Sequence, residues 1–127
     1  MIKKFWQNKK IVVTGGDGFV GSHLVELLCS YGAKIKLFVR NSRLKNIPLN
    51  IQKKLEIIRV DLNNKDEIKA AISNEKIVIN LAASVGGIEY NMNHPASIFR
   101  DNIIPFINLI DSYKDKKLER FCIVSSA

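Results

Sequence analysis

Apolar and polar residues follow two different periods along the first part of the chain. Lys10 to Thr14 is a β-branched run that enters a glycine-rich turn, and Phe19 to Tyr31 then carries apolar residues at helical spacing. Gly32 suits the end of a helix, and Lys34 to Val39 alternates between polar and apolar residues as strands do. The pattern therefore predicts a strand, a glycine turn, a helix and a second strand.

The middle of the chain continues this alternation of strands and helices. Asn41 to Lys54 is polar and contains a proline, which predicts a connection with at most a short helix. Leu55 to Val60 predicts a third strand and Lys76 to Leu81 a fourth. Between them, Asn63 or Asn64 is expected to cap a short helix that runs through Ser73.

The last third predicts a loop, a long helix and a fifth strand. Ala83 to Asn93 is expected to be a loop, and Pro95 suits the first position of a helix that continues to Tyr113. Pro105 lies inside this helix and is expected to kink it. Arg120 to Val124 then predicts the fifth strand, close to the end of the sequence.

Strands that alternate with helices pair in parallel, and right-handed crossovers favour one topology. We therefore predict an α/β fold with a doubly wound, Rossmann-like parallel sheet of strand order 3-2-1-4-5 that stops after its fifth strand. The length of 127 residues fits a single domain over residues 1–127.

Composition narrows the class of protein. The longest apolar runs are only a few residues, and no secretory signal follows the basic first ten residues, so we expect a cytoplasmic protein without a membrane partner. Cys29 and Cys122 share no metal or redox spacing and are expected to be reduced core residues; no metal site is predicted.

The sequence is basic, with 20 Lys and Arg against 12 Asp and Glu. Such a charge attracts anions in general, including nucleotides and phosphorylated sugars. The lysines occur mostly in scattered pairs without a nucleic-acid motif, so we interpret them as a solvated face and do not expect nucleic-acid binding.

The glycine turn carries the most specific chemistry. Gly15, Gly18 and Gly21 are three positions apart, directly after a strand and at the start of a helix. Glycines in this arrangement allow a tight turn, a close approach of backbone to a pyrophosphate, and close packing of helix on sheet. The helix amides then face the phosphates, so the turn, including Phe19 and Val20, predicts a dinucleotide site.

Arg40 ends the second strand, 19 positions beyond Gly21. A site that prefers an unphosphorylated ribose carries Asp or Glu near this position. Because an arginine can pair with a 2′-phosphate, we predict NADP in preference to NAD, with Arg43 as a further contact.

The ordered set of motifs resembles the extended short-chain dehydrogenase/reductase family, the NAD(P)-dependent nucleotide-sugar epimerases and dehydratases. The resemblance covers the whole chain and rests on the glycine turn with Ser22-His23-Leu24, on Asp61-Leu62, on Asn80-Leu81-Ala82-Ala83, on Asn102 and on Ser125-Ser126-Ala127. It implies that Asp61 and Leu62 border the adenine and that Leu81, Ala82 and Ala83 line the nicotinamide side. Ser126 matches the serine that hydrogen-bonds the reacting sugar oxygen, whereas Asn102 is expected to be a structural hydrogen-bonder.

Within this family, the segment Val85-Gly86-Gly87-Ile88 looks most like that of GDP-fucose synthase and GDP-mannose 3,5-epimerase. In those enzymes the corresponding loop faces the sugar. The resemblance therefore implies that Val85, Gly86 and Gly87 form a substrate loop for a nucleotide-linked hexose, with a GDP-linked hexose as the specific candidate.

The family's Tyr-x-x-x-Lys pair is expected after the serine motif. Tyr113 and Lys117 have this spacing, but they precede the fifth strand, at the sheet edge opposite the predicted cofactor, so we reject them as catalytic. His23 and His94 are expected to be structural. We interpret the chain as the amino-terminal, cofactor-binding portion of a longer enzyme, inactive alone, that dimerises or associates with a partner through the edge of its fifth strand.

Two functions remain open at this point. The first is an epimerase, dehydratase or reductase that moves hydride between a dinucleotide and a nucleotide-linked hexose. The second is a non-catalytic dinucleotide-binding sensor or interaction module, for which Arg40 and the missing Tyr-Lys pair are the arguments.

Overall fold

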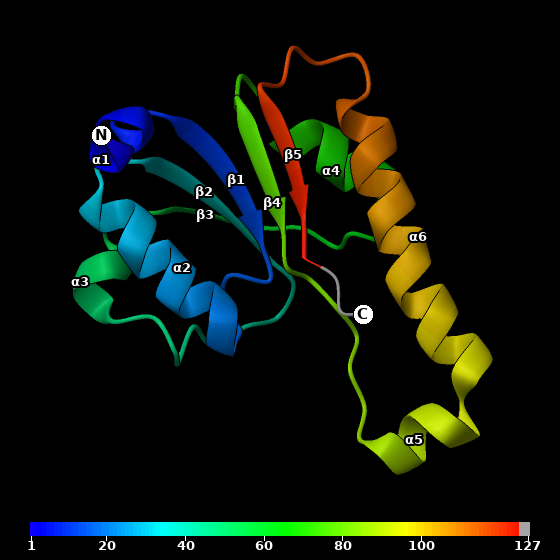
Figure 1. Ribbon diagram of the computed structural model, residues 1–127. Helices are drawn as coiled ribbons and strands as arrows, with labels where there is room; N and C mark the ends of the chain where they lie inside the picture. Colours follow the sequence, from blue (N-terminus) through cyan, green and yellow to red (C-terminus); the bar gives the residue numbers. More distant parts are fainter. Residues whose placement is uncertain (125–127) are drawn as a thin grey trace.

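A parallel sheet of five strands forms the centre of the computed structural model, which describes residues 1–124 (Figure 1). The strand order is β3-β2-β1-β4-β5, which confirms the predicted doubly wound topology. The strands are β1 (Lys10–Thr14), β2 (Lys34–Val39), β3 (Glu56–Arg59), β4 (Ile77–Asn80) and β5 (Arg120–Ile123).

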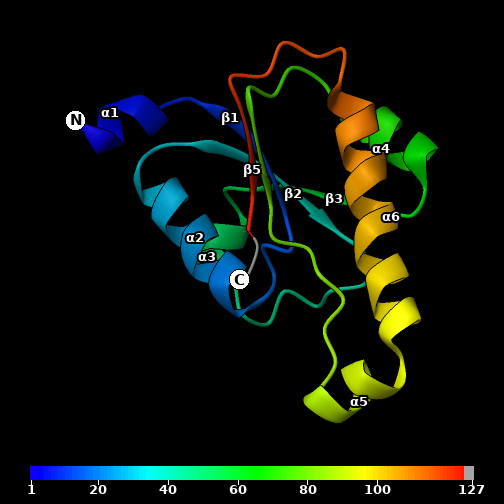
Figure 2. The same cartoon turned by 45° about the vertical axis from the view of Figure 1, so that its right-hand side comes forward.

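Helices cover both faces of this sheet. In Figures 1 and 2, α2 and α3 lie on one side of the strands, and α4 and α6 lie on the other. The helices are α1 (Ile2–Trp6), α2 (Phe19–Ser30), α3 (Leu49–Gln52), α4 (Lys65–Ala71), α5 (Ile88–Asn93) and α6 (Pro95–Tyr113).

The strand period of two residues divides the core into two layers. Ile11 and Val13 of β1 point toward α2, where Val25 and Leu28 complete a buried cluster. Val12, between them in the sequence, points the other way and packs with Ile68 of α4 and Leu109 of α6. A strand buried on both faces therefore reads as a continuous apolar run, which is what the sequence of β1 shows.

The sequence placed the strands and the long helices within two residues of their observed bounds. Of the two proposed caps for α4, Asn64 is the one observed, and its side-chain oxygen accepts from the backbone N–H groups of Asp66 and Glu67. Helix α6 continues through Pro105 to Tyr113, so the proline does not end it.

Two short helices were not predicted. Helix α1 has five residues and α5 has six, within the segment expected to be a loop. Helices this short show less than two turns of periodicity and are not stable by propensity alone. Other contacts hold them instead: Trp6 of α1 packs against the core, and within α5 Tyr90 stacks on the C-cap residue His94 with ring centroids 4.4 Å apart.

The two cysteines differ in their exposure to solvent. Cys29 is half-buried, and burial raises the pKa of its thiol. Cys122 is exposed on β5, so its predicted core location is wrong: an edge strand leaves one side of the chain open. Ile123 and Val124 are also exposed there, and association through this edge stays a prediction.

None of the described helices is long and apolar enough to cross a bilayer.

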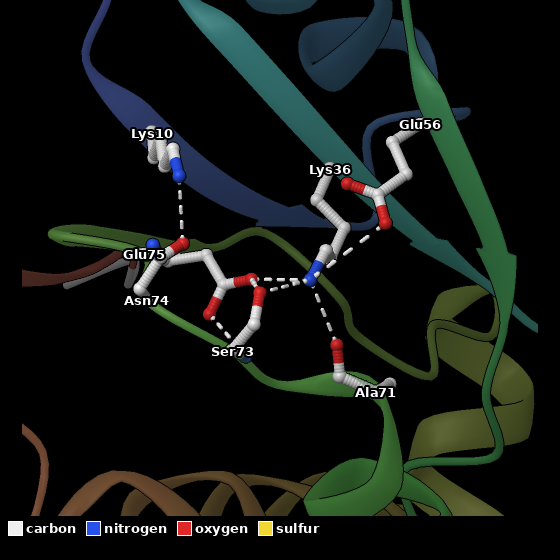
Figure 3. Close-up of polar contacts among 7 residues, drawn as sticks. All are labelled: Lys10, Lys36, Glu56, Ala71, Ser73, Asn74 and Glu75. Atoms are coloured by element: carbon white, nitrogen blue, oxygen red, sulfur yellow. Dashed lines mark hydrogen bonds and ion pairs between the residues drawn. The ribbon is translucent and has the colours of Figure 1, made fainter.

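A buried ion pair links β2 to the chain before β4 (Figure 3). Lys36 and Glu75 are each only 6% exposed, and the Lys36 ammonium donates to the Glu75 carboxylate. The same ammonium donates to the carbonyl of Ala71 and the hydroxyl of Ser73, both at 2.9 Å. Glu56 lies 3.8 Å away on the adjoining strand. Lys36 thus joins the end of α4 to the sheet, and nothing in the sequence pattern marked it as buried.

Candidate functional site

The glycine turn joins the carboxyl end of β1 to the start of α2. Gly15 has a φ of +66°, in the left-handed region that L side chains rarely adopt. A Cβ at this position would lie 2.6 Å from the backbone nitrogen of Ala82, so the turn is in close contact with the chain that leaves β4. Gly15 is therefore required both by its conformation and by the lack of space.

Gly21 is required for a different reason. It lies in the first turn of α2 and is buried, and a Cβ there would come 2.2 Å from the carbonyl oxygen of Gly15. The helix can approach the turn this closely only without a side chain at this position. Gly16, which the motif argument did not use, has a similar role: its Cβ would meet the side chain of Leu37 at 2.4 Å.

A hydrogen-bond network fixes the turn relative to β4. The hydroxyl of Thr14 donates to the side-chain oxygen of Asn80 at 2.5 Å, in a buried position. The same hydroxyl accepts from the backbone N–H of Ala82 at 3.3 Å, and the Leu81 N–H donates to the Thr14 carbonyl at 3.1 Å. The two segments that the sequence assigned to the pyrophosphate and to the nicotinamide are therefore adjacent.

The start of α2 presents free backbone donors to solvent. Gly18 is the N-cap and is exposed, and it has no side chain that could accept from the first-turn amides. The side chains of Phe19 and Val20 are 80% and 63% exposed. Because first-turn N–H groups have no acceptor within their helix, this end of α2 attracts an anion through its amides and its dipole.

The carboxyl ends of β2 and β3 bring arginines together. Arg40 follows β2 and is exposed, and its carbonyl accepts from the guanidinium of Arg59, at the end of β3, at 3.3 Å. Arg43 is exposed in the loop that follows, and the side chain of Asn46 in this loop donates to the carbonyl of Asp17 in the glycine turn. Sequence reasoning missed Arg59, because its proximity to Arg40 depends on the pairing of β2 with β3.

Asp61 and Leu62 lie just beyond β3. The Asp61 carboxylate accepts from the backbone N–H of Asn63, while its own N–H donates to Glu67. Leu62 packs against the second core cluster, and its carbonyl accepts from Asn108 of α6. Both residues are half-buried and held by this capping structure.

Asn102 clamps the segment that follows β4. Its side-chain oxygen accepts from the N–H of Ser84 at 2.8 Å, and its side-chain nitrogen donates to the Ser84 carbonyl at 2.9 Å. This is the structural role expected from the sequence. Ala82 is half-buried and Ala83 exposed, so the clamp fixes a segment that is otherwise open to solvent.

Replacing Asn102 with alanine should speed hydrogen exchange at the Ser84 amide by about fivefold, since one net hydrogen bond is worth about 1 kcal/mol. Exchange measured by NMR checks this. Asn93→Ala, at an exposed position on α5, is the matched control and should leave the rate unchanged. Equal rates in wild type and Asn102→Ala would contradict the clamp.

The predicted substrate loop leads into α5. Val85 is 85% exposed, and Gly87 is the N-cap of α5 with nothing within 4 Å of an added Cβ. Gly86 is packed under Tyr90, whose ring an added Cβ would meet at 2.4 Å. Of this glycine pair, only Gly86 is required by local packing.

The rejected Tyr113 lies away from the glycine turn, whereas His23 lies on α2 close to it. Tyr113 ends α6, near the start of β5, and burial, with the Glu75 carboxylate, raises the pKa of its phenol. Its hydroxyl has no hydrogen-bond partner within residues 1–124. His23 and His94 each hydrogen-bond a carbonyl one helical turn back. Ser126 lies outside the described residues.

These contacts fit a dinucleotide. Gly18, the exposed N-cap, leaves the start of α2 open to a pyrophosphate, and Ala82, with its small side chain, lies beside Gly15. All of these positions follow the carboxyl ends of adjacent strands, where open α/β sheets bind ligands. Fold and strand order together define an α/β protein of the Rossmann class.

The chain belongs to the NAD dependent epimerase/dehydratase family, whose model matches residues 11–127. It is 28% identical over 131 residues to the bifunctional UDP-glucose 4-epimerase and UDP-xylose 4-epimerase 1 of Pisum sativum, covering 94% of this chain and 37% of that protein. The chain thus spans less than two-fifths of this relative's length.

Solved structures agree with the fold. An epimerase from Methanothermobacter thermautotrophicus superimposes with a TM-score of 0.85 at 24% identity, over 98% of this chain and 37% of that one. The UDP-glucose 4-epimerase of Thermus thermophilus, solved in complex with NAD, superimposes with a TM-score of 0.73 at 26% identity, over 88% of this chain and 36% of that one.

Proposed function

We propose that this chain is the NAD(P)-binding part of a nucleotide-sugar epimerase, dehydratase or reductase. The observation that carries the proposal is the contact between the glycine turn and the end of β4, where Gly15 and Ala82 touch and the Thr14 hydroxyl joins both segments. This contact brings the proposed pyrophosphate and nicotinamide subsites side by side. Family membership supports the same interpretation.

Each part of the proposed site has a distinct task. The first-turn amides of α2 bind the pyrophosphate, and the open position at Gly18 lets it reach them. Asp61 and Leu62 border the adenine, while Leu81, Ala82 and Ala83 line the nicotinamide side and exclude water from it. The bound dinucleotide supplies a hydride acceptor for the sugar carbon that is oxidised.

We propose NADP as the preferred cofactor. Arg40 and Arg59 end neighbouring strands and are exposed, so two guanidinium groups are available to a 2′-phosphate. Charge-assisted hydrogen bonds to phosphate favour the phosphorylated ribose. The family is described as NAD dependent, and the Thermus thermophilus structure contains NAD. A preference of this chain for NADP would therefore differ from both, and measuring it tests the proposed role of Arg40.

Thermal unfolding with NADPH or NADH tests both statements. We expect both cofactors to raise Tm, NADPH more, and Arg40→Ala to weaken NADPH binding about tenfold while leaving NADH binding unchanged. Arg100→Ala, at an exposed position on α6, is the matched control. No shift with either cofactor would contradict dinucleotide binding. Equal shifts that do not depend on Arg40 would contradict the NADP preference alone.

We propose a nucleotide-linked hexose as the substrate of the whole protein, and specifically a GDP-linked hexose, from the resemblance of the segment Val85-Gly86-Gly87. This segment and α5 lie beyond the carboxyl end of the sheet (Figure 2), where a sugar would meet the nicotinamide. Ser126 is proposed to hydrogen-bond the reacting sugar oxygen. The pea relative is named for UDP-glucose and UDP-xylose. GDP-linked and UDP-linked hexoses are therefore the two substrates to compare.

A non-catalytic dinucleotide sensor is the second candidate. The observation that favours it is the exposed Arg40 after β2, where a site for an unphosphorylated ribose carries an acidic residue. Turnover of any nucleotide sugar by this chain would exclude a purely sensory role.

A further inference from the structure

The amino ends of the strands form a basic edge. Lys10 begins β1 and Lys34 begins β2, and the two are in register. Lys76 directly precedes β4, its N–H donates to the Lys10 carbonyl at 2.9 Å, and its own carbonyl accepts from the N–H of Arg120, which begins β5. All four side chains are exposed, whereas β3 begins with Glu56. Because parallel strands begin at the same end of the sheet, positive charges from residues far apart in the sequence lie close together here. We call these four residues the basic edge.

Helix α1 is held against this same edge. The Lys34 N–H donates to the Lys9 carbonyl at 2.8 Å, and the Asn8 N–H donates to the Gly32 carbonyl at 2.8 Å. Trp6 packs against the first core cluster. Figures 1 and 2 show α1 beside the start of β1, at the end of the sheet opposite the glycine turn.

The outer side of α1 is both apolar and basic. Met1, Ile2 and Phe5 are 110%, 68% and 44% exposed, although a water-exposed surface rarely gathers such side chains in one patch. Lys3 and Lys4 are exposed between them. The match to the family model begins at residue 11, after this helix.

The nearby carboxylates do not neutralise this charge. Glu119 is paired with Lys9 at 2.5 Å, and Glu75 is buried with Lys36. The turn before β5 contains Asp115, but lysines flank it. The basic edge therefore keeps an excess of positive charge next to exposed apolar side chains.

We propose that α1 and the basic edge form a peripheral attachment site for an anionic lipid surface. The lysines contact the lipid phosphates and carboxylates, and Ile2 and Phe5 enter the boundary between headgroups and acyl chains. Exposed aliphatic side chains among the lysines favour lipid over nucleic acid, whose phosphates offer them no apolar environment. The sequence predicted no membrane partner because its apolar runs are short, and that pattern does not show that α1 lies beside the amino ends of the strands.

This placement leaves the candidate dinucleotide site free. The glycine turn lies at the carboxyl ends of the strands, so a surface bound at the amino ends faces away from it. Binding to lipid and binding to dinucleotide are therefore expected to be independent. The proposal does not rest on the proposed function.

Vesicle binding provides the test. We expect the chain to sediment with phosphatidylcholine vesicles that contain about one-third phosphatidylserine, and not with phosphatidylcholine alone, with binding lost at high salt. Trp6 is the only tryptophan, so energy transfer from it to a dansyl lipid reports directly on α1. This readout on the unmodified chain does not depend on whether any variant folds.

Two sets of variants locate the contact. Lys3→Glu with Lys4→Glu should weaken binding by about 30-fold or more, and Ile2→Ser with Phe5→Ser by about tenfold. Lys45→Glu with Arg100→Glu, at exposed positions in the loop after β2 and on α6, changes net charge equally and should have little effect. The proposal is overturned if anionic vesicles do not bind, if the control pair weakens binding as much, or if duplex DNA binds more tightly than the vesicles.

Discussion

Gly21→Ala should lower the free energy of unfolding by about 3 kcal/mol, lower Tm by about 10 °C, and abolish dinucleotide binding. Alanine is the better helix former by about 1 kcal/mol, so propensity alone predicts stabilisation. The added methyl would lie 2.2 Å from the Gly15 carbonyl oxygen and 2.6 Å from the Gly16 Cα, and these backbone atoms cannot move aside as a flexible side chain could. The steric cost therefore exceeds the gain in propensity.

Gly87→Ala is the matched control. It also lies at the start of a helix, but a Cβ there meets nothing within 4 Å, so stability should change little. Thermal unfolding with and without NADH and NADPH measures both effects. A Gly21→Ala chain that binds dinucleotide as wild type does would show that the close approach of α2 to the turn is unnecessary.

Lys36→Met should destabilise the fold at neutral pH by about 3 kcal/mol, the usual cost of removing one partner of a buried ion pair. Methionine fills much of the lysine volume, so the loss comes mainly from the charge left on Glu75. That carboxylate would keep its hydrogen bonds from the N–H and hydroxyl of Ser73 but lose its cation. Urea unfolding at pH 7 measures the change.

The same pair gives a pH dependence with a defined sign. Burial alone would raise the pKa of Glu75, but the hydrogen bonds from Lys36 and Ser73 hold it below its ordinary value of 4.5. A carboxyl group with a lowered pKa stabilises the fold above that value, and the contribution is lost as the pH falls below it. In Lys36→Met, burial is less opposed and the pKa rises, so the difference from wild type should shrink toward pH ~4.

Lys65→Met is the control for this experiment. Lys65 forms an ion pair with Asp111 at 2.6 Å on the surface, where solvent screens the interaction, so its loss should change the unfolding midpoint little. Equal effects of the two methionine variants at pH 7, or a Lys36→Met effect that grows in acid, would contradict a buried charge at Glu75.

The strands and longer helices could be predicted because their signals are local. Lys10–Thr14 and Lys34–Val39 alternate or run apolar over their whole length, and α6 repeats apolar residues over several turns. Helices α1 and α5 are too short for such periodicity. Helix α1 depends on contacts with distant segments, such as Trp6 on the core and Asn8 on Gly32, which no local pattern encodes.

The candidate site was predictable to the extent that it is a motif. Gly15, Gly18 and Gly21 are recognisable by spacing, and the structure gives each a separate reason in conformation, access or packing. Gly16 and Arg59 were missed. Their roles follow from Leu37 and Arg40 on the neighbouring strand, and a sequence does not show which residues oppose one another across strands.

The sequence by itself determined the order of elements, the parallel topology and the glycine turn, because periodicity and turn chemistry act over a few neighbouring residues. Only the tertiary structure decided that Lys36 is buried with Glu75 and that Cys122 is exposed. It also gathered Lys10, Lys34 and Lys76 at one edge. These outcomes depend on which strands adjoin and which strand lies at the edge, since burial and charge density are properties of the assembled sheet.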